Sequence, residues 1–175
     1  MSSGAGDPGA ESMGIPVDSN LQRQIMGQFA TGVTIVTTKS GNTMSGMTAN
    51  AVLSLSLEPP LILVAVDRQG SMHGLLEEGG CFAVNVLKRE HEHLSRRFAE
   101  KGEKDFSGLE IEAVETGAPV LCDALAYADC RIVDVARGGD HDLFIGEMVA
   151  GAIAGGGDPL IFFGGDYCGL EAGAE

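Results

Sequence analysis

The sequence predicts a mainly β domain, and three observations support this class. Runs rich in Val, Ile and Thr recur along the chain, at 31–38, 61–66, 81–87, 127–135, 142–153 and 160–163. Glycine-rich turns separate them, as at 155–157. Few segments have helical spacing, so strands and helices do not alternate as a doubly wound parallel fold requires. These features predict an antiparallel barrel, closed or nearly closed.

Length and composition predict one domain. The 175 residues suffice for one substantial core. Residues 1–17 are rich in Gly, Ser, Ala and Pro, which predicts a disordered arm ahead of a domain spanning 18–175. The first residues have neither the basic nor the apolar region of a signal peptide, and no apolar run reaches the roughly 20 residues of a membrane-spanning helix. We therefore expect a cytoplasmic protein.

Charge and cysteine content exclude several function classes. A net charge of -14 argues against binding nucleic acid or anionic membranes. The four cysteines form no C-x-x-C pair, and no histidine lies at zinc-site spacing from them. Reduced, mostly buried thiols and the absence of a metal site are the predicted outcome.

The first predicted element is a helix. Asp18 or Ser19 can cap it, because both side chains accept hydrogen bonds from free backbone amides at a helix start. Four apolar residues then share one helical face, which predicts packing against the core; these are Leu21, Ile25, Met26 and Phe29.

Strands follow this helix. The 31–38 run is followed by a turn at 39–43, so we expect a hairpin into the polar run at 46–57. Pro59 and Pro60 end that run. Residues 61–66 are apolar on both parities, which predicts a strand buried on both faces.

Two more helices are expected in the middle of the chain. Ser71 is predicted to cap a short helix that Gly79 and Gly80 end. Residues 89–100 form a second helical pattern with Leu94 and Phe98 facing inward. The segment 101–116 is polar and is expected to be irregular.

The polar run at 46–57 is unusual for a strand that only builds a core. Thr48, Asn50, Ser54 and Ser56 share one parity, so a regular strand would place all four on one face. Small neighbours such as Gly46 and Ala49 let a ligand approach the backbone. Two readings fit this pattern: a surface that hydrogen-bonds a flat polar ligand, and a half-exposed strand with a solvated face.

The chain resembles the flavin reductase family, the short NAD(P)H:flavin oxidoreductases that serve two-component flavin-dependent monooxygenases. The resemblance covers roughly residues 21–170 and rests on motifs in a fixed order. These motifs are the runs at 29–38, 46–60, 59–66 and 82–87, and the Gly-Asp-His signature at 139–147. The resemblance implies an FMN-binding split barrel, a Greek-key barrel that pairs into a homodimer with flavin sites near its interface.

The resemblance also implies which residues meet the flavin. It assigns the ring and ribityl chain to the polar run, and the tail to a loop before the short helix, whose free amides suit a phosphate. It further includes Asn85, and one of Arg96 and Arg97 faces either a phosphate or solvent. The implied flavin contacts are Met47, Thr48, Ala49, Asn50, Ala51, Val52, Ser54, Ser56, Gln69, Gly70, Ser71, Asn85 and Arg97.

His141 is the residue that the resemblance places beside the nicotinamide, where it would orient the ring for hydride transfer. Tyr167 is a second candidate near the pyridine nucleotide, with packing on the barrel as the alternative. His91 and His93 flank Glu92 in a polar helix and are expected to face solvent. His73 is left unassigned.

The implied activity is hydride transfer from NADH or NADPH to FAD or FMN, with reduced flavin passing to a partner monooxygenase. The low count of basic residues, 11 Lys and Arg, favours NADH. The absence of tryptophan suits an open flavin face and a flavin that leaves after reduction. One alternative is a non-catalytic flavin- or haem-binding split-barrel protein. A pyridoxamine-phosphate oxidase fits less well, because the chain has no evident basic cluster for a second phosphate.

Overall fold

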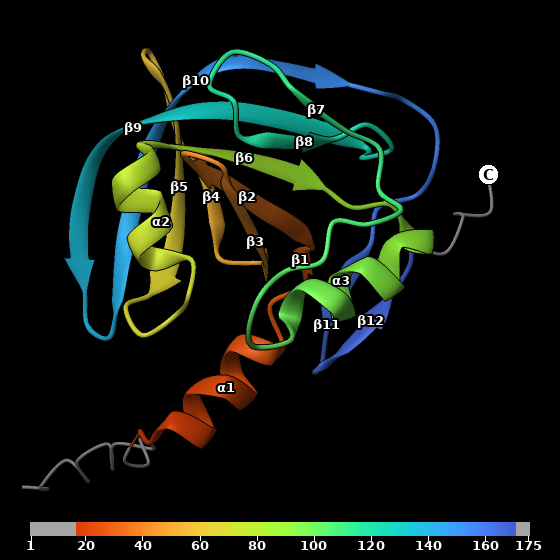
Figure 1. Cartoon of the computed structure of the whole chain (residues 1–175). Helices are drawn as coiled ribbons and strands as arrows, with labels where there is room; N and C mark the ends of the chain where they lie inside the picture. The colour runs from red at the N-terminus through yellow and green to blue at the C-terminus, as the bar shows by residue number, and fades with distance from the viewer. Residues whose placement is uncertain (1–16, 171–175) are drawn as a thin grey trace, which may run out of the picture.

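The computed structural model describes residues 17–170 (Figure 1). The predicted arm at 1–17 lies outside this range except for Val17. The helices are α1 (Ser19–Gly27), α2 (His73–Gly79), the 3-10 helix η1 (Arg89–His91) and α3 (Glu92–Ala99). The strands are β1 (Thr31–Gly32), β2 (Thr34–Ser40), β3 (Thr43–Ala49), β4 (Val52–Leu57), β5 (Pro60–Asp67), β6 (Cys81–Val86), β7 (Ile111–Ala113), β8 (Pro119–Leu121), β9 (Ala126–Gly138), β10 (His141–Ile153), β11 (Ile161–Phe163) and β12 (Asp166–Cys168).

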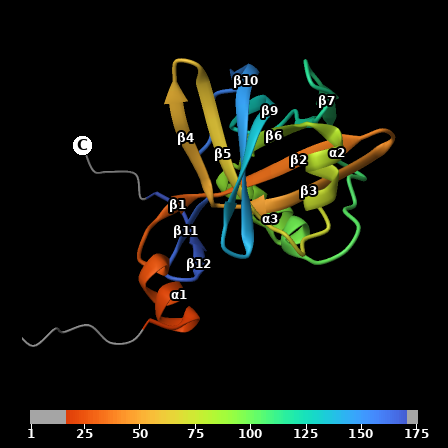
Figure 2. The same cartoon turned by 90° about the vertical axis from the view of Figure 1, so that its left-hand side faces the viewer.

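A seven-stranded antiparallel sheet dominates the fold, in the order β3-β2-β6-β9-β10-β5-β4. The predicted mainly β, antiparallel class is therefore confirmed. The sheet curls strongly, and its two edge strands, β3 and β4, follow each other in sequence (Figure 2). Two small sheets complete the fold, β1-β11-β12 and β7-β8.

The polar run forms two strands, where the sequence suggested one. Thr43–Ala49 pairs with β2 and Val52–Leu57 pairs with β5, so the chain crosses between the sheet edges at Asn50 and Ala51. A register shift between Ser54 and Ser56 further breaks the alternation. Thr48 consequently does not share a regular face with Ser54 and Ser56.

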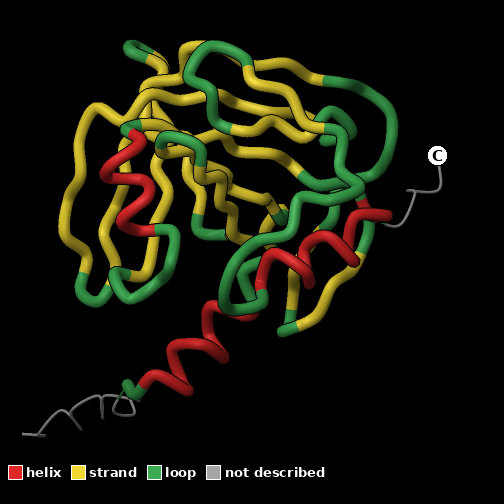
Figure 3. Tube along the Cα trace, in the orientation of Figure 1, coloured by secondary structure: helices red, strands yellow, loops and turns green. Residues whose placement is uncertain are grey.

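Two apolar clusters fill the interior. One packs α2 against the sheet and includes Phe82 and Phe144, which have no exposed surface. The other lies beneath α3 and includes Leu94 and Phe98. The inward face predicted for the 89–100 helix is thus correct. Figure 3 shows α2 and α3 on different parts of the curled sheet.

Helix α1 has the predicted N-cap, but its apolar face is exposed where core packing was expected. The Asp18 carboxylate accepts hydrogen bonds from the amides of Asn20 and Leu21 at 2.9 and 2.8 Å. The helix projects away from the sheet (Figure 1) and buries none of its residues. Ile25 and Met26 remain 57% and 56% exposed, so the expected core packing is wrong for the single chain.

Several local expectations need correction. The α2 N-cap is Met72, with no side-chain hydrogen bond, so Ser71 is not the cap. His91 is buried, so its predicted exposure to solvent is wrong. Its Nδ1 accepts the Lys88 amide, and its Nε2 meets the Asp123 carboxylate. In β5, only Val64 and Val66 are fully buried, so one parity faces the core. The segment 101–116, expected to be irregular, contributes β7.

The four cysteines are free, two buried and two exposed. Burial, with a smaller contribution from Asp129, raises the pKa of Cys130 to about 12, so this thiol stays protonated at neutral pH. Alkylation of the native protein is expected to modify Cys122 and Cys168 alone, with Cys81 and Cys130 reacting after unfolding.

Mass spectrometry before and after denaturation measures the alkylation. A variant carrying Cys122→Ser and Cys168→Ser serves as the control and should take up no label when native. Rapid labelling of all four thiols at neutral pH would contradict the burial of Cys81 and Cys130.

No helix within residues 17–170 has the length and apolarity needed to cross a bilayer. Over the same residues, no group of three or more His, Cys, Asp or Glu side chains comes close enough together to bind a metal ion.

Candidate functional site

Three neighbouring pockets follow the chain where it crosses from β3 to β4. The first, of about 510 Å³, is here called the basic pocket. It is lined by Gly46, Met47, Thr48, Val66, Asp67, Gln69, Gly70, Ser71, Met72, Phe98, Ala99, Glu100, Lys101, Gly102 and Lys104. The polar run, the loop before α2 and the end of α3 therefore meet around one space.

A smaller pocket of about 140 Å³, the junction pocket, lies beside it. It is lined by Val33, Thr48, Ala49, Asn50, Phe162 and Tyr167. Because Thr48 lines both spaces, the two pockets are neighbours along β3.

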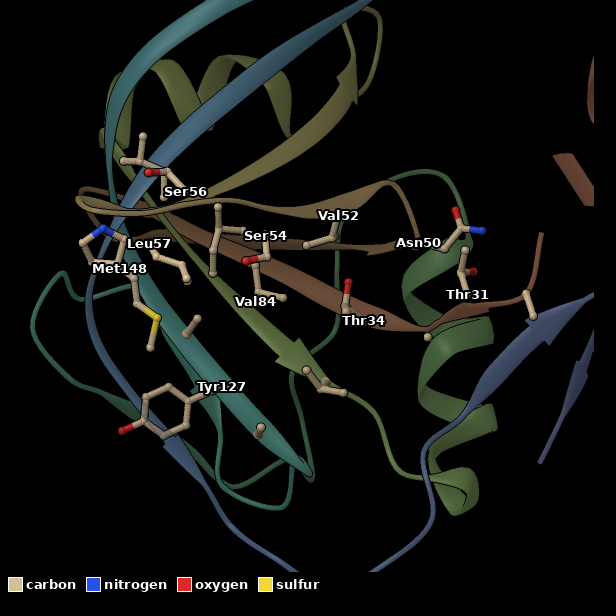
Figure 4. Close-up of a pocket in the computed structure, with 18 of the residues that line it drawn as sticks. Thr31, Thr34, Asn50, Val52, Ser54, Ser56, Leu57, Val84, Tyr127 and Met148 are labelled. Carbon is tan, nitrogen blue, oxygen red and sulfur yellow. The ribbon is translucent and has the colours of Figure 1, made fainter. Parts of the chain in front are cut away.

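The third space, the sheet pocket of about 610 Å³, lies inside the curled sheet. Figure 4 shows side chains converging on it from β4 (Val52, Ser54, Ser56), β6 (Val84), β9 (Tyr127) and β10 (Met148). Asn50 lines this pocket and the junction pocket. The three pockets therefore adjoin one another along residues 46–56, and together they are here called the groove, with lysines at one end and a mainly apolar wall at the other.

The wall between the first two pockets is fixed to α3. The Thr48 hydroxyl donates to the carbonyl of Ser95 at 2.5 Å, and the Ser95 hydroxyl lies 2.7 Å from the Tyr167 hydroxyl. Ser95 has no exposed surface. One buried serine thus holds both the polar strand and the aromatic ring that line the junction pocket.

Tyr167 is also held through its ring. Phe162 contacts it edge-on with centroids 5.5 Å apart, and the Arg96 guanidinium lies 4.9 Å from the ring centre. Arg96 additionally pairs with Glu92 at 2.7 Å. The Glu92 hydrogen bond raises the pKa of Arg96, so its charge is committed to this surface network.

Two lysines at one end of the groove, beside the Asp67 and Glu100 carboxylates of the same pocket, were not among the residues predicted to bind a ligand. Lys101 and Lys104 line the basic pocket opposite the 69–71 loop. Partial burial lowers the pKa of Lys104, and the Glu100 carboxylate opposes that shift. An anion beside Lys104 would favour its charged form. The polar 101–116 segment carried no motif that could have identified these two lysines.

His141 begins β10, at the tip of the β9–β10 hairpin. It is the register partner of Asp67, the residue at the rim of the basic pocket. Its side chain is 43% exposed, and its Nδ1 lies 2.8 Å from the Asp140 carboxylate. That hydrogen bond is the main cause of a lowered pKa at Asp140. The hairpin therefore presents an oriented imidazole next to the 67–71 loop.

Most of the residues implied to bind the cofactors come together in the groove. Met47, Thr48, Ala49, Asn50, Val52, Ser54, Ser56, Gln69, Gly70, Ser71 and Tyr167 all line it. Ala51 does not line these pockets; it is exposed, and its carbonyl accepts the Ala65 amide at 3.1 Å.

Asn85 and Arg97 lie elsewhere, which corrects their assignment. The Asn85 side chain is fully buried: its amide donates to the Ile35 carbonyl at 3.0 Å and its oxygen accepts the Leu121 amide at 2.8 Å. Arg97 donates to the carbonyls of Asp105 and Ser107, both at 3.3 Å. Asn85 thus joins strands, and Arg97 holds the loop after α3.

The groove fits an elongated ligand with an anionic tail and a flat heteroaromatic ring. Loop amides and lysines suit a phosphate, short hydroxyls and an amide suit the polar edge of a ring, and the sheet pocket supplies apolar contact. The breadth of this donor set matches a flavin better than it matches haem, because no histidine lines the three pockets.

Comparison with known proteins agrees with this geometry. Residues 26–171 match the family described as "Flavin reductase like domain". The chain is 35% identical over 161 residues to the reductase subunit HsaB of a flavin-dependent monooxygenase from Mycobacterium tuberculosis, covering 91% of this chain and 86% of that protein. It is 37% identical over 160 residues to the FMN reductase (NADH) SmoA of Agrobacterium fabrum, with 91% and 87% coverage.

A solved structure adds a three-dimensional match. The Streptomyces globisporus NADH:FAD oxidoreductase SgcE6, in complex with NAD and FAD fragments, superposes with a TM-score of 0.85 at 35% identity. The alignment covers 90% of this chain and 96% of that one. The chain therefore belongs to the flavin reductase family.

Proposed function

We propose that this chain transfers a hydride from NADH to FAD or FMN in the groove along residues 46–56 and the adjoining 67–71 loop. The observation that supports it most is that the three pockets adjoin, because Thr48 and Asn50 each line two of them. The lysine-bearing end and the His141 hairpin lie next to the same loop. The hydride itself passes between nicotinamide and flavin, chemistry that belongs to those two molecules.

The tail of the flavin is assigned to the basic pocket. There the Gln69–Ser71 loop offers backbone amides and the Ser71 hydroxyl, and Lys101 and Lys104 offer positive charge. In a protein of net charge -14, these two lysines balance the Asp67 and Glu100 carboxylates of the same pocket, which makes the site less repulsive to an anionic tail than the rest of the surface.

The ring is assigned to the junction between β3 and β4. Asn50 is exposed there, between the two strands, and its side chain offers both a donor and an acceptor. Thr48 has its hydroxyl proton committed to Ser95, so it faces the ligand as an acceptor and as a fixed wall.

His141 is assigned to orienting the nicotinamide. Its Nδ1 is held by Asp140, which leaves Nε2 free to meet the carboxamide of the nucleotide or its ring edge. Holding two reactants in an attack geometry can contribute several orders of magnitude to rate. No protein nucleophile or protein-derived acid is needed for this transfer.

Reduced flavin then passes to a partner flavin-dependent monooxygenase. The groove supports this release, because Thr48, Ala49 and Asn50 supply short side chains to the junction pocket, while its two aromatic rings, Phe162 and Tyr167, pack against each other.

The fold is assigned to the split-barrel type and the assembly to a homodimer. Apolar side chains on β4 and just after α1 support the pairing, because they are uncovered in the single chain. Phe29 is 66% exposed and Leu57 is 84% exposed, and both line the mouth of the sheet pocket. A second copy of the chain is the proposed cover. Sedimentation should give the mass of two 18.1 kDa chains, and a monomer at micromolar concentration would overturn this pairing.

The activity is tested by mixing purified protein with NADH and excess FAD or FMN in air. NADH absorbance should fall faster than in the flavin-only control, and under anaerobic conditions the reduced flavin should be recovered free of the protein. Tight flavin binding without NADH oxidation would instead identify a non-catalytic flavin carrier. Flavin that stayed bound through gel filtration would contradict release.

A further inference from the structure

A buried hydrogen bond joins α2 to the strand that carries His141. His73 Nε2 lies 2.8 Å from Asp142 Oδ2, and the two side chains are 13% and 11% exposed. The His73 ring also contacts Phe144 edge-on, with centroids 5.3 Å apart at 73°. Contact on the ring edge and at Nε2 together fixes both side chains in one arrangement.

His73 and Asp142 lie next to the two segments that are assigned to the cofactors. His73 begins α2, and its amide donates to the Gly70 carbonyl at 3.1 Å, so it is tied directly to the flavin-tail loop. Asp142 follows His141 in β10. The hydrogen bond therefore spans the short gap between the loop proposed to hold flavin and the histidine proposed to orient nicotinamide.

The β5–β10 ladder already pairs Asp67 with His141, and beyond Asp67 the other contacts from the loop to the hairpin are exposed. The Arg68 amide donates to the Asp140 carbonyl at 3.1 Å, and the Arg68 guanidinium donates to the Gly139 carbonyl at 2.6 Å. Hydrogen bonds that compete with water hold geometry weakly, whereas a buried one is costly to break. The His73–Asp142 contact is thus a buried side-chain restraint that supplements the β5–β10 ladder between loop and hairpin.

Burying the Asp142 carboxylate costs free energy that an apolar core residue would not. Its Oδ1 atom is buried and has no hydrogen-bond partner in the described structure. Beside Phe144, an apolar side chain of similar size would avoid that desolvation cost, because buried polar pairs are often no more stable than apolar replacements. What the carboxylate supplies instead is a directional contact to His73.

We propose that His73 and Asp142 are positioning residues for hydride transfer, which hold His141 in place relative to the flavin-tail loop. This inference rests on the proposed function of His141. Asp142 and Phe144 point to the core, while His141 occupies the opposite face of β10. Asp142 therefore acts through the backbone of the strand and does not touch the nucleotide.

The test compares three substitutions at this contact. Asp142→Leu and His73→Leu should each slow the anaerobic single-turnover hydride transfer by about five- to tenfold at saturating NADH and flavin. Asp142→Asn should stay within about twofold, because the amide oxygen still accepts the Nε2 proton. The double leucine variant should be no slower than either single one, since both remove the same contact.

Glu77→Gln is the matched control. Glu77 lies 3.6 Å from the other ring nitrogen of His73, but its side chain is 56% exposed, so this variant should leave the rate unchanged. Replacing the transferred hydrogen of NADH by deuterium adds a second readout. The isotope effect on turnover should rise in the leucine variants, because the transfer step becomes more rate-limiting.

The outcomes separate this inference from the function on which it rests. If His141→Ala leaves hydride transfer unchanged, the proposed role of His141 fails. If His141→Ala slows transfer but both leucine variants only lower the melting temperature, with normal rate and isotope effect, the positioning role is overturned. Should Asp142→Leu fail to fold, His73→Leu and Asp142→Asn give the same comparison.

Discussion

Replacing His141 with alanine is expected to lower the hydride-transfer rate from NADH by about 10- to 100-fold, while the dissociation constant for flavin stays nearly unchanged. The reason is spatial separation. His141 lies at the hairpin tip outside the three pockets assigned to flavin, so its loss removes an orienting contact to nicotinamide and leaves the flavin walls intact.

Stopped-flow measurement under anaerobic conditions gives the rate, and flavin fluorescence gives the dissociation constant. His93→Ala is the control, because His93 is an exposed histidine on α3 that does not line the groove. A His141→Ala variant with normal transfer but weakened flavin binding would move this histidine from the nucleotide to the flavin.

The pH dependence of this contact follows from Asp140. Its pKa lies below the usual value of about 3.9, chiefly because its carboxylate is hydrogen-bonded to His141. The contact is therefore fully present above that usual value and is lost as the pH falls through the lowered pKa. A pH–rate profile should therefore show no loss of activity near neutral pH that arises from protonation of Asp140.

Gly46→Ala is expected to destabilise the fold by about 1–3 kcal/mol and to weaken flavin binding. A β-carbon at this position would lie 2.9 Å from two ring carbons of Phe98 and 3.3 Å from the Val36 carbonyl oxygen. Phe98 is buried, and its ring centroid lies 5.1 Å from that of Phe106, so the ring has no free space to rotate into. Helix α3 must move away from β3, and the Thr48–Ser95 contact moves with it.

A fall in melting temperature of about 2–4 °C per kcal/mol should accompany this change. Gly32→Ala is the control for the melting temperature alone, since Gly32 is also a strand glycine with open space where the β-carbon would go, but it lines the sheet pocket. An unchanged melting temperature for Gly46→Ala would show that α3 yields without cost, and unchanged flavin affinity would separate the basic pocket from the position of α3.

Gly46 also shows what the sequence could and could not predict. The pattern around it correctly indicated a close approach at this position, but it suggested a ligand where the structure has Phe98. Side-chain periodicity reports on the local strand, while contact with α3, 52 residues further on, depends on how the sheet curls. The class of fold, the β2–β3 hairpin and the inward face of α3 were accessible because each depends on local spacing.

The residues of the site likewise divide into those that local sequence could identify and those that it could not. The polar run and the 69–71 loop carried residue types whose chemistry was recognisable, and the structure brings them into one groove. Ser95, Lys101 and Lys104 were not recognised, because a serine in a helix and lysines in a polar segment are typical of ordinary surfaces. Asn85 was misassigned, since an amide within an apolar strand can equally satisfy neighbouring backbone groups, as it does here.

The two edge strands of the large sheet are joined only by Asn50 and Ala51, and no ladder of backbone hydrogen bonds links β3 to β4 in the described chain. A gap bounded in this way can widen or narrow without sacrificing any inter-strand pairing. A flavin reductase must take up an oxidised ring and release a reduced one in every cycle. The entrance is thus the part of the sheet that deforms at the lowest free-energy cost, so exchange can be fast while the rest of the sheet stays rigid.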